Sequence, residues 1–179
     1  MDEEALIALG ANLPSVAGAP AEALRAATAR LEAIFGPARR SRIWATPAWP
    51  AGAGPDYANA AIAVPAGGRA PEEVLALLHE VEAAFGRARG ARWAARTLDL
   101  DLIGQGDAVR GGAAGAWAED AEGGEGGLVL PHPRMRARAF VLLPLAEVAP
   151  GWRHPALGLT VLQMLAALPE AERAAARPL

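Results

Sequence analysis

The sequence predicts an α+β fold in which helices cover a mostly antiparallel β-sheet, and two observations lead to this prediction. Short apolar runs with a period of two alternate along the chain with longer apolar patterns of helical period. Two of the expected strands follow one another with only a loop between them, so the element order is β-α-β-β-α-β. That order is typical of a ferredoxin-like α/β/α sandwich, although the alternation alone also allows an α/β sandwich.

The first half of the chain supplies three of the strands and one helix. Residues 5–9 are expected to form a buried strand that ends in a turn at Gly10-Ala11-Asn12. A helix begins at Pro20 and ends at Gly36-Pro37, because its apolar residues recur on one face and proline suits the first turn. Residues 39–44 and 57–64 are expected strands. Prolines and glycines in residues 46–55 predict the loop between them.

The second half supplies the clearest helix and the most informative strand. Pro71 opens a helix with acidic residues in its first turn, and Gly86 ends it. An arginine-rich loop leads to a strand at residues 98–104. The apolar residues 140–145 are expected in the core as a helix or a strand, and residues 161–168 as a last helix.

Length and composition bound the architecture and the location. The 179 residues are enough for one well-buried core, so we expect a single domain over 1–179, with a flexible glycine-rich and acidic excursion at 106–127 and a frayed tail at 170–179. The sequence has no apolar run long enough to cross a bilayer, and it begins with an acidic stretch that is unlike a signal peptide. With no cysteine in the chain, we expect a cytoplasmic protein. We also expect a monomer.

Charge points to a small anionic ligand and away from nucleic acid. The net charge of −3 disfavours bulk binding to nucleic acid, which needs a basic surface. All 17 basic residues are arginines. Guanidinium groups suit phosphate oxygens, so a local cluster in an acidic protein suggests a polyphosphate ligand. The cluster comprises Arg87, Arg89, Arg92, Arg96, Arg134, Arg136 and Arg138, with His132 close by in the sequence.

The strand at 98–104 contains a pair of aspartates, Asp99 and Asp101. Period two places them on one face, opposite Leu98, Leu100 and Leu102, with Cα atoms roughly 7 Å apart. Such a pair can hold one or two divalent cations that also bind phosphate oxygens. The alternative is an edge strand with an acidic solvent-facing side.

Aromatic and amide side chains provide a third group, which could stack on a flat heterocycle and bind its edge. Each has a structural alternative: Tyr57 and Phe140 could be core residues, and His132 a loop residue. Asn59 is harder to explain structurally, because asparagine is depleted in strands. No glycine-rich phosphate loop is present, so a phosphoryl-transfer site would depend on metal and arginine. The group comprises Trp49, Tyr57, Asn59, Trp93 and Phe140.

Several motifs occur together between about residue 5 and residue 150. The most specific are the run Arg96-Thr97-Leu98-Asp99-Leu100-Asp101-Leu102 and the pair Pro131-His132-Pro133-Arg134 and Arg138-Ala139-Phe140-Val141-Leu142. The others are Ala8-Leu9-Gly10-Ala11-Asn12-Leu13, Thr46-Pro47, Pro55-Asp56-Tyr57-Ala58-Asn59 and Gly86-Arg87-Ala88-Arg89. In this combination and order the chain resembles one family, the 6-hydroxymethyl-7,8-dihydropterin pyrophosphokinases of folate biosynthesis.

The resemblance implies transfer of diphosphate from ATP to the hydroxymethylpterin, giving AMP and the pterin diphosphate. It implies that Asp99 and Asp101 bind two Mg²⁺ ions, and that Tyr57 and Phe140 sandwich the pterin. It further implies that Asn59 and the backbone around Thr46 and Pro47 read the edge of the pterin ring. From the aromatic group we also expect Trp49 to contact the substrate. The implied contacts to ATP are Arg87, Arg89, Arg96, His132, Arg138, Trp93 and Glu82.

Glu82 has a structural alternative, because helical spacing alone favours an exposed charge there. Two other functions remain open for the whole chain. One is a metal-dependent phosphohydrolase or simple kinase, which would give ADP, and the other is a binding domain without chemistry.

Overall fold

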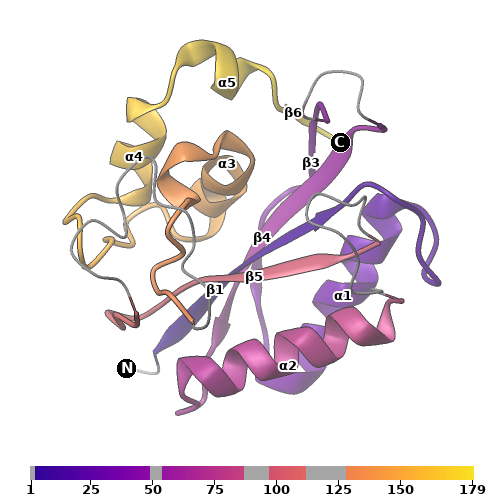
Figure 1. The fold of residues 1–179 in the computed structure, drawn as a ribbon, viewed down its shortest axis with the longest axis horizontal. Coiled ribbons are helices and arrows are strands. Elements are labelled where there is room, and N and C mark those ends of the chain that lie inside the picture. Colours follow the sequence, from indigo (N-terminus) through magenta and orange to yellow (C-terminus); the bar gives the residue numbers. More distant parts are fainter. Residues whose placement is uncertain (1–2, 49–53, 87–96, 112–127) are drawn as a thin grey trace.

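An antiparallel β-sheet runs through the middle of the computed structural model (Figure 1). The structure describes residues 3–48, 54–86, 97–111 and 128–179. Its elements in chain order are β1 (Glu4–Ala11), α1 (Pro20–Phe35), β2 (Arg39–Arg40), β3 (Trp44–Thr46), β4 (Tyr57–Pro65), α2 (Pro71–Ala84), β5 (Asp99–Gln105), a 3₁₀ turn (Met135–Ala137), α3 (Ala139–Val148), α4 (Val161–Ala167), α5 (Glu170–Ala174) and β6 (Arg177–Pro178).

The strand order confirms the predicted α+β class. Neighbouring strands follow the order β5-β1-β4-β3-β6, with β2 also paired to β4, and each of these pairings is antiparallel. The four strands β1, β3, β4 and β5 with helices α1 and α2 have the ferredoxin-like connection, because β1 lies between β4 and β5. The antiparallel pairing excludes the α/β alternative, whose sheets are mainly parallel.

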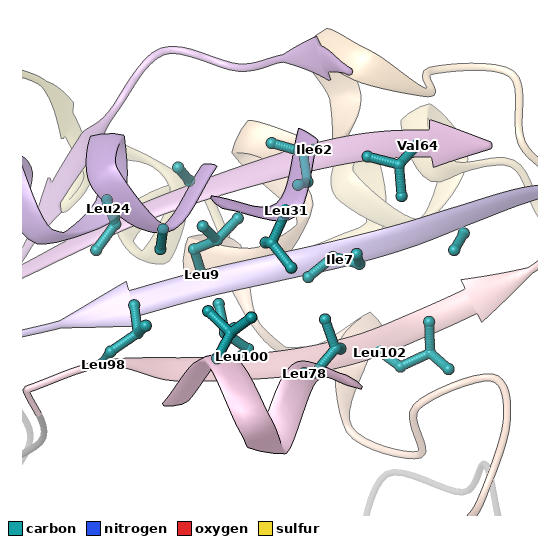
Figure 2. Packing of buried hydrophobic residues seen from close by; sticks show 14 of the residues in the cluster. Ile7, Leu9, Leu24, Leu31, Ile62, Val64, Leu78, Leu98, Leu100 and Leu102 are labelled. Carbon is teal, nitrogen blue, oxygen red and sulfur yellow. The ribbon is translucent and has the colours of Figure 1, made fainter. Parts of the chain in front are cut away.

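One face of the sheet packs on α1 and α2. Leu9 of β1 and Leu100 of β5 point toward these helices, where they meet Leu24, Leu31 and Leu78 (Figure 2). All five side chains are at most 2% exposed, and burying each leucine stabilises the fold by about 1.5–3 kcal/mol. This half of the core confirms the predicted helical faces and the predicted inward side of β5.

The other face packs on α3 and α4. Leu6, Ala61, Ala63 and Ile103 from the sheet contact a second apolar cluster that includes Leu142 and Leu145 of α3. The apolar residues 140–145, for which helix and strand were both open, are therefore helical. Together the two faces give the predicted α/β/α layering, visible in Figure 1 with α1 and α2 below the sheet and α3 above it.

The expected strand at 39–44 is interrupted, which corrects the sequence prediction. Arg40 pairs with Ile62 and Trp44 pairs with Asn59, so residues 41–43 oppose only residues 60 and 61. The extra residue makes a bulge. The Ser41 hydroxyl accepts a hydrogen bond from the Ala61 backbone N–H at 2.9 Å, which satisfies that donor within the bulge.

Two further expectations were wrong. Gly10 and Ala11 do not form a turn, because they are the last two residues of β1 and pair with Asn59 and Ala58 of β4. Residues 170–179 are not a frayed tail, because they form α5 and the short strand β6 on the edge of β3. The excursion predicted at 106–127 lies mostly outside the described residues, and its described beginning joins Arg110 to Leu130 through two backbone hydrogen bonds.

Within the described ranges, none of the helices is long and apolar enough to span a membrane.

Candidate active site

The candidate site occupies the end of the sheet face that α3 does not cover. Going along β1 on this face, Leu6 belongs to the apolar cluster under α3, and Ala8 lies at its border. Gly10 follows on the same face, because side chains alternate along a strand. From Leu6 to Gly10 the residues on this face of β1 therefore become smaller as the strand leaves the cover of α3. Over the same distance, the residues paired with them on β4 and β5 change from apolar to polar.

A row of residues across three strands defines the centre of the site. Gly10 pairs with Asn59 of β4 on one side and with Asp99 of β5 on the other. Since paired residues share a face, the Asn59 and Asp99 side chains flank Gly10 from strands roughly 10 Å apart. A Cβ atom added to Gly10 would lie 3.4 Å from Asn59 Oδ1. With glycine at this position, no side chain projects from β1 between the Asn59 amide and the Asp99 carboxylate, and we call this part of β1, Ala8 and Gly10, the floor of the site.

The second aspartate lies one row away. Asp101 pairs with Ala8, which pairs in turn with Ala61 on β4. Asp99 and Asp101 are both partly exposed, whereas Leu98, Leu100 and Leu102 on the opposite side of the strand are buried. This confirms the predicted division of β5 into an acidic face and an apolar face.

The donor set of these two aspartates fits Mg²⁺. Magnesium prefers oxygen ligands and is usually held by one or two carboxylates, with substrate phosphates and water completing its shell. In the part of the chain that the structure describes, no group of three or more His, Cys, Asp and Glu side chains comes together as a metal cage.

Asn59 is held by a neighbouring strand. Its side chain is 5% exposed, and its Nδ2 group donates a hydrogen bond of 2.8 Å to the Thr46 hydroxyl on β3. Thr46 pairs with Tyr57, which lies two residues before Asn59 and therefore on the same face of β4. The structure thus brings Thr46, Tyr57 and Asn59 together, as the sequence predicted for Tyr57 and Asn59. Pro47 follows Thr46 directly and is exposed.

The beginning of α3 contributes an arginine and an aromatic ring. Arg138 is the residue that precedes the helix, and Phe140 lies in its first turn. The Arg138 guanidinium carbon lies 5.5 Å from the centroid of the Phe140 ring. Phe140 is 39% exposed, so it is not the core residue that was the structural alternative.

His132 connects the segment before α3 to β5. Its backbone N–H donates to the Ile103 carbonyl at 2.8 Å, and its Nδ1 accepts a hydrogen bond from the Arg134 backbone N–H at 3.2 Å. Burial, followed by the positive charges of Arg138 and Arg134, lowers the pKa of His132 to about 4, although the charge of Asp99 opposes this shift. His132 is therefore neutral at pH 7, and its proton lies on Nε2 because Nδ1 is an acceptor.

Glu82 is buried, so the structural alternative that it is an exposed helix charge is wrong. The side chain is 3% exposed, and its Oε1 accepts a hydrogen bond of 2.7 Å from the backbone N–H of Leu100. Leu100 lies between the two aspartates on β5. The carboxylate on α2 thus binds the backbone of the strand that presents them.

Some predicted site residues cannot be placed, and others were missed. The predicted residues Trp49, Arg87, Arg89, Trp93 and Arg96 lie outside the described residues. Sequence reasoning missed the role of Gly10 and Ala8 as the floor of the site, because it assigned Gly10 to a turn. Extending the alternation of residues 5–9 by one step would have placed Gly10 in the strand, on the same face as Ala8.

Comparisons with known proteins agree with this geometry. Residues 6–150 match the family model described as 7,8-dihydro-6-hydroxymethylpterin-pyrophosphokinase. The chain is 37% identical over 165 residues to a 2-amino-4-hydroxy-6-hydroxymethyldihydropteridine pyrophosphokinase of Synechocystis, covering 90% of this chain and 74% of that protein.

Two further relatives have the same description. The enzyme of Methylorubrum extorquens is 34% identical over 148 residues, which is 82% of either chain. That of Pseudomonas aeruginosa is 39% identical over 100 residues, covering 56% of this chain and 53% of that protein. The chain belongs to the 7,8-dihydro-6-hydroxymethylpterin-pyrophosphokinase family.

Proposed function

We propose that this protein transfers diphosphate from ATP to 6-hydroxymethyl-7,8-dihydropterin and so forms AMP and the pterin diphosphate of folate biosynthesis. Family membership supports the reaction. The observation that carries it is the row in which Asn59 and Asp99 flank Gly10, on the part of the sheet face that α3 does not cover. Such a row offers hydrogen bonds to a flat heterocycle at one end and carboxylates for metal-bound phosphates at the other.

In the proposed reaction, the pterin hydroxyl oxygen forms a bond to the β-phosphorus of ATP. The bond from that phosphorus to the α,β-bridging oxygen breaks, AMP leaves with this oxygen, and the hydroxyl proton passes to solvent. Little covalent chemistry is required of the protein, so catalysis depends on alignment and on neutralising charge.

Asp99 and Asp101 are proposed to hold two Mg²⁺ ions. When bound, magnesium would supply Lewis-acid polarisation of the phosphoryl oxygens and charge neutralisation. The aspartates fix where this positive charge lies relative to β5. Their partial exposure leaves them accessible to metal and phosphate.

The pterin is proposed to lie against β4. Asn59, oriented by the Thr46 hydroxyl, binds the polar edge of the ring, with the backbone at Thr46 and Pro47 beside it. Tyr57 and Phe140 stack on the two ring faces, and Trp49 belongs to the same pocket. Phe140 is suited to this role because a large apolar ring that is 39% exposed gains free energy when a ligand covers it.

The triphosphate is proposed to lie between β5 and the segment before α3. The Arg138 guanidinium binds phosphate oxygens, and neutral His132 donates from Nε2–H. Arg87, Arg89, Arg96 and Trp93 are proposed to complete the ATP contacts, and Glu82 remains a predicted contact as well. We further propose one domain over 1–179, a monomeric state and a cytoplasmic location, the last of which fits a chain without cysteine.

The nucleotide product tests the proposal. Purified protein incubated with ATP, Mg²⁺ and the reduced hydroxymethylpterin is expected to release AMP in equal amount to the pterin diphosphate, as resolved by anion-exchange chromatography. A simple kinase or phosphohydrolase would release ADP. ADP as the sole nucleotide product would therefore contradict the proposal.

A further inference from the structure

The last strand of the chain pairs with the strand that orients Asn59. In the register of β6 on β3, Pro178 lies opposite Trp44 and Arg177 opposite Ala45. The Leu179 backbone N–H extends this pairing by donating to the Ile43 carbonyl at 2.8 Å. Figure 1 shows β6 and β3 side by side at one edge of the molecule. Residues after 150 lie outside the family match, so this pairing is not part of the matched pattern.

Among the described residues, β3 has few supports other than β6. The strand has three residues, the bulge at 41–43 separates it from β2, and Pro47 follows it. Beyond its pairing with β4, a hydrogen-bonded ion pair at 2.8 Å joins Arg42, just before the strand, to Glu147 of α3. Without β6 the outer backbone groups of β3 would form an unpaired sheet edge.

A second contact reaches the beginning of β4. The Arg177 guanidinium lies 3.4 Å from the carboxylate of Asp56, the residue before Tyr57. Both side chains are more than half exposed, so the ion pair adds little free energy. It does connect β6 to the residue before β4, in addition to the direct pairing of β6 with β3. These two strands carry the predicted pterin contacts Thr46 (β3) and Tyr57 (β4).

We propose that β6 is a positioning element for the pterin end of the site. By pairing with β3 it fixes the Thr46 hydroxyl, and the Thr46 hydroxyl in turn orients the Asn59 amide. This inference rests on the proposed function, since it takes the pterin as the ligand of Asn59. The effect is confined to the pterin, because the aspartates are on β5 at the opposite edge of the sheet.

The test compares two substitutions at Leu179. Leu179→Pro removes the N–H that donates to Ile43, whereas Leu179→Ala retains it and loses only a side chain that is 63% exposed. Leu179→Pro is expected to raise KM for the pterin at least about fivefold, the loss expected for one misplaced hydrogen bond. KM for ATP and Tm are expected to match those of Leu179→Ala, which should behave as wild type.

Hydrogen exchange checks the same step without substrate. Backbone amides of β3 are expected to exchange faster in Leu179→Pro than in Leu179→Ala, with amides of β5 unchanged. Unaltered exchange in β3, or an unaltered KM for the pterin, would overturn the inference. A parallel deterioration of both KM values and Tm would also overturn it, since it would reduce β6 to a purely structural strand.

Failure of the proposed function gives a different result. Wild-type protein that forms no pterin diphosphate would refute the proposed reaction. The inference is then decided by equilibrium binding of the hydroxymethylpterin, with the fluorescence of the pterin as the signal. Weaker binding by Leu179→Pro than by Leu179→Ala supports it, and equal or absent binding overturns it.

Discussion

Asp99 and Asp101 contribute little to the hydrophobic core, although the proposed chemistry depends on them. Their side chains are partly exposed and lie on the face of β5 opposite the buried Leu100 and Leu102. Replacing either by alanine is expected to lower kcat at least about 100-fold, because charge stabilisation in the transition state is lost. Tm should change by little, as for most exposed substitutions.

A matched control is available on the same segment. Asp107 is an exposed carboxylate in the turn after β5, and Asp107→Ala should retain wild-type turnover. Near-normal turnover in Asp99→Ala or Asp101→Ala, measured under saturating Mg²⁺, is incompatible with the metal assignment.

Glu82 is the residue for which the structure changes the expectation most. Its buried carboxylate accepts the Leu100 N–H, so Glu82→Ala leaves this donor unpaired inside the protein. The expected loss is about 1–3 kcal/mol of unfolding free energy. Urea denaturation measures it, and Glu82→Gln, which retains an acceptor oxygen, should lose less. Equal stability of Glu82→Ala and wild type would show that the hydrogen bond contributes nothing.

At the scale of elements, the floor of the site is a property of three strands together. Gly10 lies between Asn59 and Asp99, and a long side chain there would fill the space proposed for the pterin. Gly10→Leu is expected to raise KM for the pterin about tenfold or more by steric exclusion. Gly10→Ala is the control, because its Cβ would lie 3.4 Å from Asn59 Oδ1, which is a van der Waals contact distance, and it would add little bulk to the site. An unchanged KM in Gly10→Leu would place the pterin elsewhere.

The sequence was sufficient to predict elements with strong hydrophobic periodicity. It was insufficient for strands that form only because they pair with another strand. The helix at 20–35 and the two faces of β5 follow from spacing and end signals alone. β6 could not be foreseen, because Arg177-Pro178-Leu179 has no strand pattern and becomes a strand only through backbone bonds to β3. The bulge at 41–43 also depends on the partner strand, because these three residues lie opposite only two residues of β4. The sequence of residues 39–44 alone does not show this mismatch.

The same distinction applies to the site. Spacing singled out Asp99 and Asp101 as a metal candidate, and the depletion of asparagine in strands singled out Asn59. The pterin role of Tyr57, in contrast, was implied only by the family resemblance. The partners of Asn59 and Glu82 are Thr46 on a neighbouring strand and the Leu100 backbone, and contacts of this kind appear only after folding.

At the scale of the whole molecule, a buried histidine with no part in the proposed chemistry predicts a pH-dependent stability. His154 is 1% exposed, and its Nδ1 accepts from the Ala156 and Leu157 N–H groups. Burial, with a contribution from the charge of Arg136, lowers its pKa to about 4 from the ordinary 6.5. Between these two pH values the unfolded chain binds a proton that the folded protein does not.

Stability should therefore fall as the pH decreases from about 6.5 toward 4, by up to about 1.4 kcal/mol per pH unit for this histidine. Urea denaturation at several pH values measures the slope. His154→Asn, whose side-chain oxygen can accept in place of Nδ1, should show a smaller slope over the same range. Identical slopes in the two proteins would mean that His154 titrates alike in the folded and unfolded states.

The reaction itself is tested most directly by identifying which phosphorus of ATP is attacked. ³¹P NMR of the complete reaction with ATP, Mg²⁺ and the hydroxymethylpterin reports this in one spectrum. Attack at the β-phosphorus predicts two coupled phosphorus resonances on the pterin product, together with AMP. A pterin product with a single phosphorus resonance, accompanied by ADP, would contradict attack at the β-phosphorus and with it the proposed function.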